Sequence, residues 1–440
     1  MDAIRNFWGR LTPLHRGLGL FLVANGLLLN LLLAALPWTR NHITALHHSG
    51  AFLIGYTNDD SWGPMAAAFD EYRGAPEVPL YPRVFFEHRI KFIYPPSSLL
   101  LHAGFAALGI DGPDRLRILV ALSWLSVVLT ALLVARLLLR SERRELGAAT
   151  VGDAPNFYVG GALAAAYTLS FFPVVYAFTV GQIQAWLTCM AIGMLLAWEQ
   201  GMPALAGALA GAVCLVKPQY ALLLAWGVVR RQWRFVAASL IPLVVGLFVS
   251  IWVFGWVNHL DYLSVLTYIA RHGESYFANQ SMNGFLHRLV ADSSHVDFEH
   301  QYATYNPWVF WGTLLSSAGF VGLALFWRAG ESKQAPTTDL LIMSLTLTLA
   351  SPVAWEHHYG PLIATFAIIL PKLVRHPVFG DKTPVYVAVS YVLLSNLFRL
   401  TDYTAPTWFN FLQSYDLIGA LMVLVALYCL RHAEAAARLA

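Results

Sequence analysis

The sequence predicts an all-α polytopic membrane protein. Of its 440 residues, 58% are hydrophobic and only 12% are charged, whereas an average soluble domain carries about 25% charged residues. Its mean hydropathy is +0.56, and apolar runs recur along the whole chain. We place these runs at 17–38, 97–110, 116–139, 158–176, 178–198, 203–215, 219–229, 234–255, 308–327, 338–351, 359–371, 384–399 and 411–430.

The length of a run decides whether it crosses the bilayer. A hydrocarbon core of about 30 Å needs about 20 helical residues, and several runs are shorter. Broken or short helices are tolerated at membrane depth only where protein or a water-filled cavity satisfies the backbone. We expect about 12 spanning helices, short or re-entrant helices in the outer loops, and one integral membrane domain over residues 1–440.

Basic residues set the predicted orientation, because Lys and Arg accumulate on the cytoplasmic side. The first apolar run follows a basic segment but is too long for a cleavable signal peptide, so we interpret it as a retained anchor. The loops at about 39–95 and 256–307 then lie outside, provided that 97–110 is too short to span. The basic clusters are Arg136, Arg140, Arg143 and Arg144; Arg230, Arg231 and Arg234; Arg328 and Lys333; Lys372, Arg375 and Lys382; with Arg5, Arg10, Arg16 and Arg431 near the ends.

Two neighbouring carboxylates, Asp59 and Asp60, open the amphipathic part of the first outer loop in "GYTNDDSWGPM". A carboxylate at this place can act as a general base toward an acceptor hydroxyl. The alternative is structural, since Asn and Asp residues also cap helices and form Asx turns.

Broken helices carry the next candidates. "TVGQIQAW" places Gln182 and Gln184 near the outer end of an apolar segment, where amides bind sugar hydroxyls or join neighbouring helices. "CLVKPQYALLL" places Lys217 beside Pro218, within an apolar run. A Lys there costs about 2.5–3.5 kcal/mol on insertion scales. It therefore either snorkels to the interface or binds an anionic headgroup.

Another set joins "YFANQSMNGFLHRL" in the second outer loop to "SPVAWEHHYG" near residue 355. The first stretch offers the amides of Asn279 and Gln280 and the Arg288 fork, which suits phosphate. The second offers His357 and His358, whose spacing is poor for a metal. They either bind the phosphate or sugar, with charge changing near pH 6.5, or satisfy each other and loop carbonyls.

Six motifs in order, "DDSWGPMAAAFDEYRG", "FIYPPSS", "VGQIQ", "LVKPQ", "NQSMNGFLHRL" and "SPVAWEHH", resemble glycosyltransferase family 87, the polyprenol-phosphate-mannose-dependent mannosyltransferases. The resemblance runs from about residue 17 to about 400. It implies a GT-C-type helical bundle with its active site at the outer face of the plasma membrane. It also implies that Asp60 is the general base, with Asp59 as a neighbour able to substitute.

By the same resemblance, a second group of residues surrounds the donor sugar and phosphate. This chain departs from the family pattern at Gln184, where Asn is frequent, and at Glu356, where Asp is frequent, which puts the sugar recognised in question. The implied donor-binding residues are Gln182, Lys217, Asn279, Gln280, Arg288, His357 and His358.

The expected reaction is inverting transfer of a sugar, mannose by the resemblance, from a polyprenyl-phosphate-linked donor to a hydroxyl on a glycolipid or glycan acceptor. Membrane lipid is the expected environment, and the scheme needs no cofactor and no metal. The net charge of +3 gives no reason to expect a nucleic-acid partner. Two alternatives remain open: a GT-C enzyme using arabinofuranose or glucose, or a glycan ligase; and a lipid or solute transporter.

Overall fold

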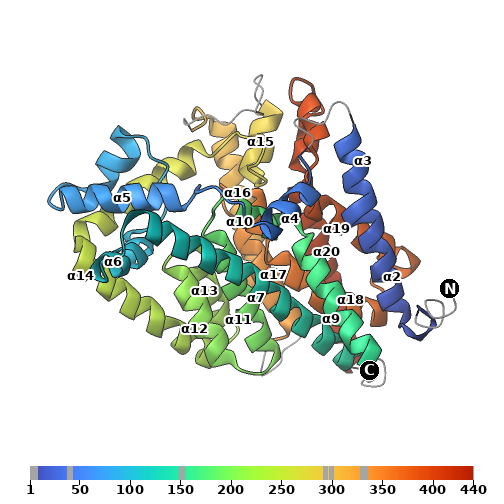
Figure 1. Ribbon diagram of the computed structural model, residues 1–440. Coiled ribbons are helices and arrows are strands. Elements are labelled where there is room, and N and C mark those ends of the chain that lie inside the picture. The colour runs from blue at the N-terminus through green and yellow to red at the C-terminus, as the bar shows by residue number, and fades with distance from the viewer. Residues whose placement is uncertain are drawn as a thin grey trace.

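The computed structural model describes residues 8–36, 43–147, 154–290, 296, 302–327 and 335–439. The regular structure in these ranges is helical, apart from one isolated bridge between Asn279 and Trp355. Figure 1 shows the helices packed into one bundle. Its main helices are α2 (Pro13–Phe21), α7 (Gly112–Leu146), α9 (Ala154–Leu169), α10 (Phe172–Thr179), α11 (Gln184–Glu199), α12 (Pro203–Cys214), α13 (Ala221–Val229), α14 (Trp233–His272), α16 (Pro307–Phe326), α17 (Thr337–Leu349), α18 (Leu362–Arg375), α19 (Thr383–Ser395) and α20 (Tyr415–Leu439).

The remaining helical elements form the loops and breaks between these helices. They are η1 (Leu22–Leu29), α3 (Asn30–Ala35), α4 (Ala45–Leu53), α5 (Trp62–Gly74), η3 (Pro82–Glu87), η4 (Pro96–Leu99), α6 (Leu100–Ala107), η5 (Pro218–Tyr220), α15 (Met282–Val290), η6 (Glu356–Tyr359), η7 (Gly380–Lys382), η8 (Arg399–Thr404) and η9 (Asn410–Ser414).

The prediction of a polytopic helical membrane protein is confirmed. Within the described residues, five helices have the length and apolar composition of a membrane span, or six if α9 and α10, bent by 54°, form one span. This number does not support the expected count of about 12. Helices such as α12 and α17 match predicted apolar runs closely, yet at 12 and 13 residues they are too short to cross alone.

Two segments in or beside the predicted outer loops are helical in the structure. The run 97–110 folds as η4 and α6, and the eight residues of α6 extend only about 12 Å, so this run is short as expected. The predicted loop 256–307 begins as helix, because α14 continues to His272 beyond a break at Gly255, where φ is +76°. Residues 39–42, 291–295 and 297–301 of the two predicted loops lie outside the described residues.

Several of the basic clusters predicted to be cytoplasmic meet acidic partners at one end of the bundle. Asp339 of α17 accepts from Arg230 at 2.6 Å and from Arg431 of α20 at 2.8 Å. Lys372 of α18 pairs with Glu434 at 2.7 Å. These ion pairs join the ends of α13, α17, α18 and α20 at one face of the bundle. Arg5, Arg328 and Lys333 lie outside the described residues.

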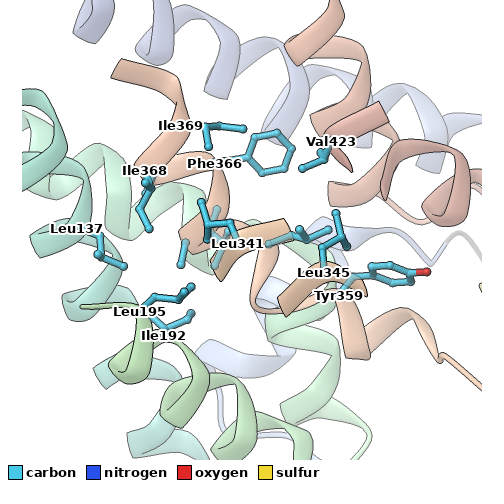
Figure 2. Close-up of a cluster of buried hydrophobic side chains, with 14 of the residues drawn as sticks. Leu137, Ile192, Leu195, Leu341, Leu345, Tyr359, Phe366, Ile368, Ile369 and Val423 are labelled. Atoms are coloured by element: carbon cyan, nitrogen blue, oxygen red, sulfur yellow. The ribbon is translucent and has the colours of Figure 1, made fainter. Parts of the chain in front are cut away.

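The opposite end of the bundle holds the helix breaks, and the apolar core extends up to them. Figure 2 shows buried side chains of α7, α11, α17, α18 and α20 meeting at the centre. Tyr359 of η6 belongs to the same cluster, so the core packs directly against the WEHH segment. The labelled members are Leu137, Ile192, Leu195, Leu341, Leu345, Tyr359, Phe366, Ile368, Ile369 and Val423.

Candidate active site

The segment that carries Asp60 is fixed by backbone pairing to the turn between α10 and α11. The amide of Asn58 donates to the Thr179 carbonyl at 2.9 Å, and the amide of Asp60 donates to the Val180 carbonyl at 2.9 Å. Gly181 allows this approach, because its φ is +73° and a Cβ there would lie 2.0 Å from the Asn58 carbonyl oxygen. Residues more than a hundred positions apart are thereby held together.

Gln182 orients the carboxylate of Asp60. Its side-chain nitrogen donates to Oδ2 of Asp60. Its side-chain oxygen accepts from the hydroxyl of Ser61 at 2.5 Å and from the hydroxyl of Tyr94 at 3.1 Å. With the oxygen occupied by two donors, only the NH₂ group of the amide can face the carboxylate. The structure thus places Gln182 on the predicted base, where the resemblance implied a donor contact.

The two carboxylates of the DD pair have different surroundings. Asp60 is exposed, so a second reactant can reach its carboxylate, yet the protein around it desolvates the charge and raises its pKa. The Gln182 hydrogen bond opposes that rise, whereas the charge of Asp59 adds to it. Asp59 is also exposed, and its backbone carbonyl accepts from the amide of Gly63 at 2.7 Å. The N-cap residue of α5 is Ser61, so helix capping is not the role of Asp60.

Lys217 lies in the break between α12 and η5 and is buried, with 8% of its surface exposed. Its ammonium donates to the side-chain oxygen of Gln184 at 2.7 Å, and Gln184 in turn donates to Thr188 at 3.3 Å. No carboxylate among the described residues forms an ion pair with Lys217. A buried ammonium with only an amide partner retains donors for an anionic ligand.

The glutamines of "VGQIQ" therefore divide between the two candidate groups. Gln182 contacts Asp60 and Gln184, two residues later, contacts Lys217. One short segment at the start of α11 thus holds a carboxylate and an ammonium at neighbouring positions.

His357 and His358 lie beside Lys217 on η6. The charge of Lys217 acts on both imidazoles, and their ring centroids are 4.8 Å apart. His357 is 3% exposed, and neither of its ring nitrogens has a hydrogen-bond partner among the residues that the structure describes. It therefore does not satisfy a loop carbonyl, which was the structural alternative.

The predicted charge change of these histidines near pH 6.5 is wrong for this structure. Burial and the nearby Lys217 charge lower the pKa of both His357 and His358 well below the ordinary value. Both rings are neutral around pH 7, and a neutral imidazole has one N–H to donate.

Asn279, Gln280 and Arg288 are buried, and most of their side-chain hydrogen bonds go to backbone. The Asn279 side chain accepts from the amide of Ala354 at 2.9 Å and donates to the carbonyl of Glu274 at 2.8 Å. Gln280 donates to the carbonyl of Gln413 at 2.7 Å. These bonds tie the second outer loop to the WEHH segment and to η9.

Arg288 strengthens the same junction. Its guanidinium donates to the carbonyl of Asn279 at 3.0 Å and to the hydroxyl of Ser414 at 2.9 Å. The structure therefore groups Arg288 with the scaffold under the WEHH segment, and its contact with a donor phosphate stays a prediction.

Some residues at the site were missed by sequence reasoning. Ser61 and Tyr94 fix Gln182, but no local pattern marks them, because their partners lie far away along the chain. Glu356, noted only as a departure from the family pattern, is buried and accepts from the Tyr415 hydroxyl at 2.9 Å. Burial raises the pKa of Glu356 to about 7.

Metal binding has no obvious place in the described ranges, which contain no group of three or more His, Cys, Asp or Glu residues that could hold an ion. The three cysteines, at positions 189, 214 and 429, are free thiols. The expectation of a metal-independent reaction stays a prediction.

Comparison with known proteins gives one match. The family model described as glycosyltransferase family 87 matches residues 92–352, which is more than half of the chain. This range contains Gln182, Lys217 and Arg288, whereas Asp60 precedes it and His357 follows it. No curated protein and no solved structure matches the chain.

Proposed function

The chain belongs to glycosyltransferase family 87, and from that membership we propose that it transfers mannose, with inversion, from a polyprenyl-phosphate-linked donor to a hydroxyl of a glycolipid or glycan. In the proposed arrangement, a GT-C-type bundle of about 12 spanning helices presents the site at the extracytoplasmic face of the plasma membrane. The observation that carries the proposal is the division of Gln182 and Gln184 between Asp60 and Lys217.

This division matches the needs of a displacement at a sugar carbon. A base has to face the attacking hydroxyl, and a positive charge has to face the departing phosphate on the other side. Asp60 is exposed and oriented by a hydrogen bond, which suits the first role. Lys217 is buried and has no carboxylate partner in the described ranges, which suits the second.

The acceptor oxygen forms a bond to C1 of the donor sugar while its proton moves to the carboxylate of Asp60. The bond between C1 and the phosphate oxygen breaks, and its electron pair leaves with the polyprenyl phosphate. Attack from the face opposite to the leaving group inverts the configuration at C1, so no covalent sugar–enzyme intermediate and no second carboxylate are needed.

In the proposed site, two histidines join Lys217 in binding the donor phosphate. Lys217 supplies charge, and a neutral His357 with unpartnered ring nitrogens supplies a hydrogen bond to a phosphate oxygen. His358 adds a second imidazole at the same place. A buried imidazole without a partner costs free energy in the unliganded protein, and binding of an oxyanion would remove that cost.

In this proposal, the donor site also depends on three residues that do not contact the donor: Asn279, Gln280 and Arg288. Because their side chains bind the backbone of three separate segments, we propose that they position the WEHH segment. Direct contact with the donor is the alternative that the sequence motif suggested. A variant such as Asn279→Ala distinguishes the two roles, because a positioning role predicts lower thermal stability together with lower turnover.

The test is transfer by the purified protein in nanodiscs from radiolabelled polyprenyl-phosphate-mannose to a panel of glycan and lipid acceptors. Asp60→Asn is expected to lose at least about 1,000-fold in turnover, because the hydroxyl then has no base. Asp59→Asn tests the neighbouring exposed carboxylate, which the resemblance allows as a substitute; with Asp60 as the base, this variant should keep most of the activity. Equal activity in both variants would remove Asp60 as the base.

Donors that carry arabinofuranose or glucose belong in the same assay. Exclusive transfer from one of them would preserve the reaction class and replace mannose. If the folded protein is inert with every lipid-linked sugar and every acceptor in the panel, the proposed function is wrong and transport becomes the leading account.

A further inference from the structure

Helix α5 begins two residues after Asp60 and carries a polar face that the proposed reaction does not use. Its buried face packs into the loop core through residues such as Trp62, Met65 and Phe69. Figure 1 shows α5 extending away from α4 and α10 toward the edge of the molecule. Whatever binds along α5 would therefore be adjacent to the base at one end.

The free face of α5 lines an open pocket of about 510 Å³. Four of its lining residues, Ala67, Asp70, Glu71 and Gly74, follow the i, i+3, i+4, i+7 spacing that places side chains on one helix face. The remaining wall comes from Ala75 and Arg83.

The charged side chains of this pocket pair with each other or with residues just outside it. Nε of Arg83 lies 3.1 Å from Oε2 of Glu71, and Nδ1 of His88 lies 3.5 Å from the other oxygen of the same carboxylate. Arg115 approaches Asp70 at 3.6 Å. Of the two carboxylates, Asp70 is the more exposed, with 59% of its side chain accessible against 35% for Glu71.

This chemistry favours hydroxyl groups over other ligands. Carboxylate oxygens accept from hydroxyls and guanidinium N–H groups donate to them. Because Asp70 and Glu71 each have a cationic partner, the pocket offers little net attraction to a phosphate. Its charged lining also disfavours a lipid tail, because the apolar chain would desolvate these groups.

We propose that this pocket is an acceptor subsite that binds a neutral glycan several sugar rings away from the reacting hydroxyl. The proposal rests on the proposed glycosyl transfer and adds to it where the rest of the acceptor lies. From Trp62 to Asp70 the helix rises about 12 Å, which exceeds the length of one sugar ring. The enzyme would then prefer acceptors that extend from Asp60 along α5.

A ladder of octyl oligomannosides of increasing length tests the proposal in two assays, direct binding by calorimetry and transfer. In the wild-type protein, Kd and acceptor KM should fall once the chain is long enough to reach the pocket. Gly74→Trp fills the pocket, since a Cβ at Gly74 meets nothing within 4 Å and its φ is not left-handed. This variant should lose the gain with length, with about tenfold weaker binding of the long acceptors.

Two further variants sharpen the result. Asp70→Ala removes the most open acceptor group and should weaken long-chain binding several-fold. Glu77→Gln changes an exposed acid of the same loop that does not line the pocket, and it should retain the length dependence.

The outcomes separate the two proposals. If Gly74→Trp and the wild-type protein bind long and short acceptors alike, the subsite is overturned even when transfer occurs. If the length dependence of binding disappears in Gly74→Trp but no donor supports transfer, the subsite stands and the proposed reaction fails. If the variant changes binding to liposomes and leaves oligomannoside binding unchanged, the pocket contacts the membrane and the proposal is wrong.

Discussion

Replacing Gln182 with Leu should move the acidic limb of the pH–rate profile to higher pH. Gln182 donates to the carboxylate of Asp60 and so favours its charged form, in opposition to the burial that raises its pKa. Removing this donor leaves the burial of Asp60 and the charge of Asp59 opposed only by the charge of Lys91. The pKa of Asp60 therefore rises further, and the base becomes protonated at a higher pH than in the wild-type protein.

The size of the shift follows from the strength of such a bond. A hydrogen bond to a charged group contributes about 1.5–3 kcal/mol, and one pKa unit corresponds to about 1.36 kcal/mol. Because Asp60 is exposed, solvent screening favours the lower end. We expect a shift of about one unit, with a smaller loss of rate at the plateau from poorer orientation of the carboxylate.

The assay is kcat/KM for the acceptor across pH at a fixed donor concentration. Gln184→Leu is the matched control, because Gln184 contacts Lys217 and not Asp60. It should raise the donor KM and leave the acidic limb unchanged. A limb that stays in place in Gln182→Leu, or moves to lower pH, would refute the assignment of Gln182 as the residue that tunes the base.

Gly181→Ala should abolish transfer, because the new Cβ would lie 2.0 Å from a backbone oxygen of the segment that carries the base. Its control is Gly201→Ala, which has the same φ of +73° but lies in open space and should stay active in the transfer assay. Asp339→Asn should cost about 3–5 kcal/mol of stability, because the buried guanidiniums of Arg230 and Arg431 lose their anionic partner. Its Tm should fall well below that of the control Asp381→Asn, which changes an exposed carboxylate, and equal Tm values would contradict this. Glu356→Gln should match the wild-type rate below about pH 7, where the carboxyl group is protonated, and diverge above it; a constant rate ratio across pH would rule out this titration.

The helices of the fold were predictable because their signal is local. The run predicted at 203–215 folds as α12 (Pro203–Cys214), since an uninterrupted apolar segment has no competing structure in a membrane. The number of spans was not predictable in the same way. A helix of 12 residues looks like a short span in sequence, and only its neighbours determine whether it crosses, re-enters or stops.

Local patterns were less informative for the site. Lys217 stood out because a charge within an apolar run is costly, whereas Asp60 stood out through the carboxylate pair and the family resemblance. The structure gives both of them amide partners. The sequence assigned Gln182 to the donor because it could not show that this amide meets Asp60 from more than a hundred residues away. Arg288 looked like a phosphate ligand for a similar reason, since the carbonyl and hydroxyl that occupy its donors belong to other segments.

The most direct test of the central claim compares donor binding and turnover in the same nanodisc preparation for Asp60→Asn and Lys217→Met. We predict that Asp60→Asn binds polyprenyl-phosphate-mannose with wild-type affinity but does not turn it over, because its role is confined to the acceptor proton. We predict that Lys217→Met binds this donor at least about tenfold more weakly, because the phosphate loses its charged partner. Weaker donor binding in Asp60→Asn together with unchanged binding in Lys217→Met would contradict the account.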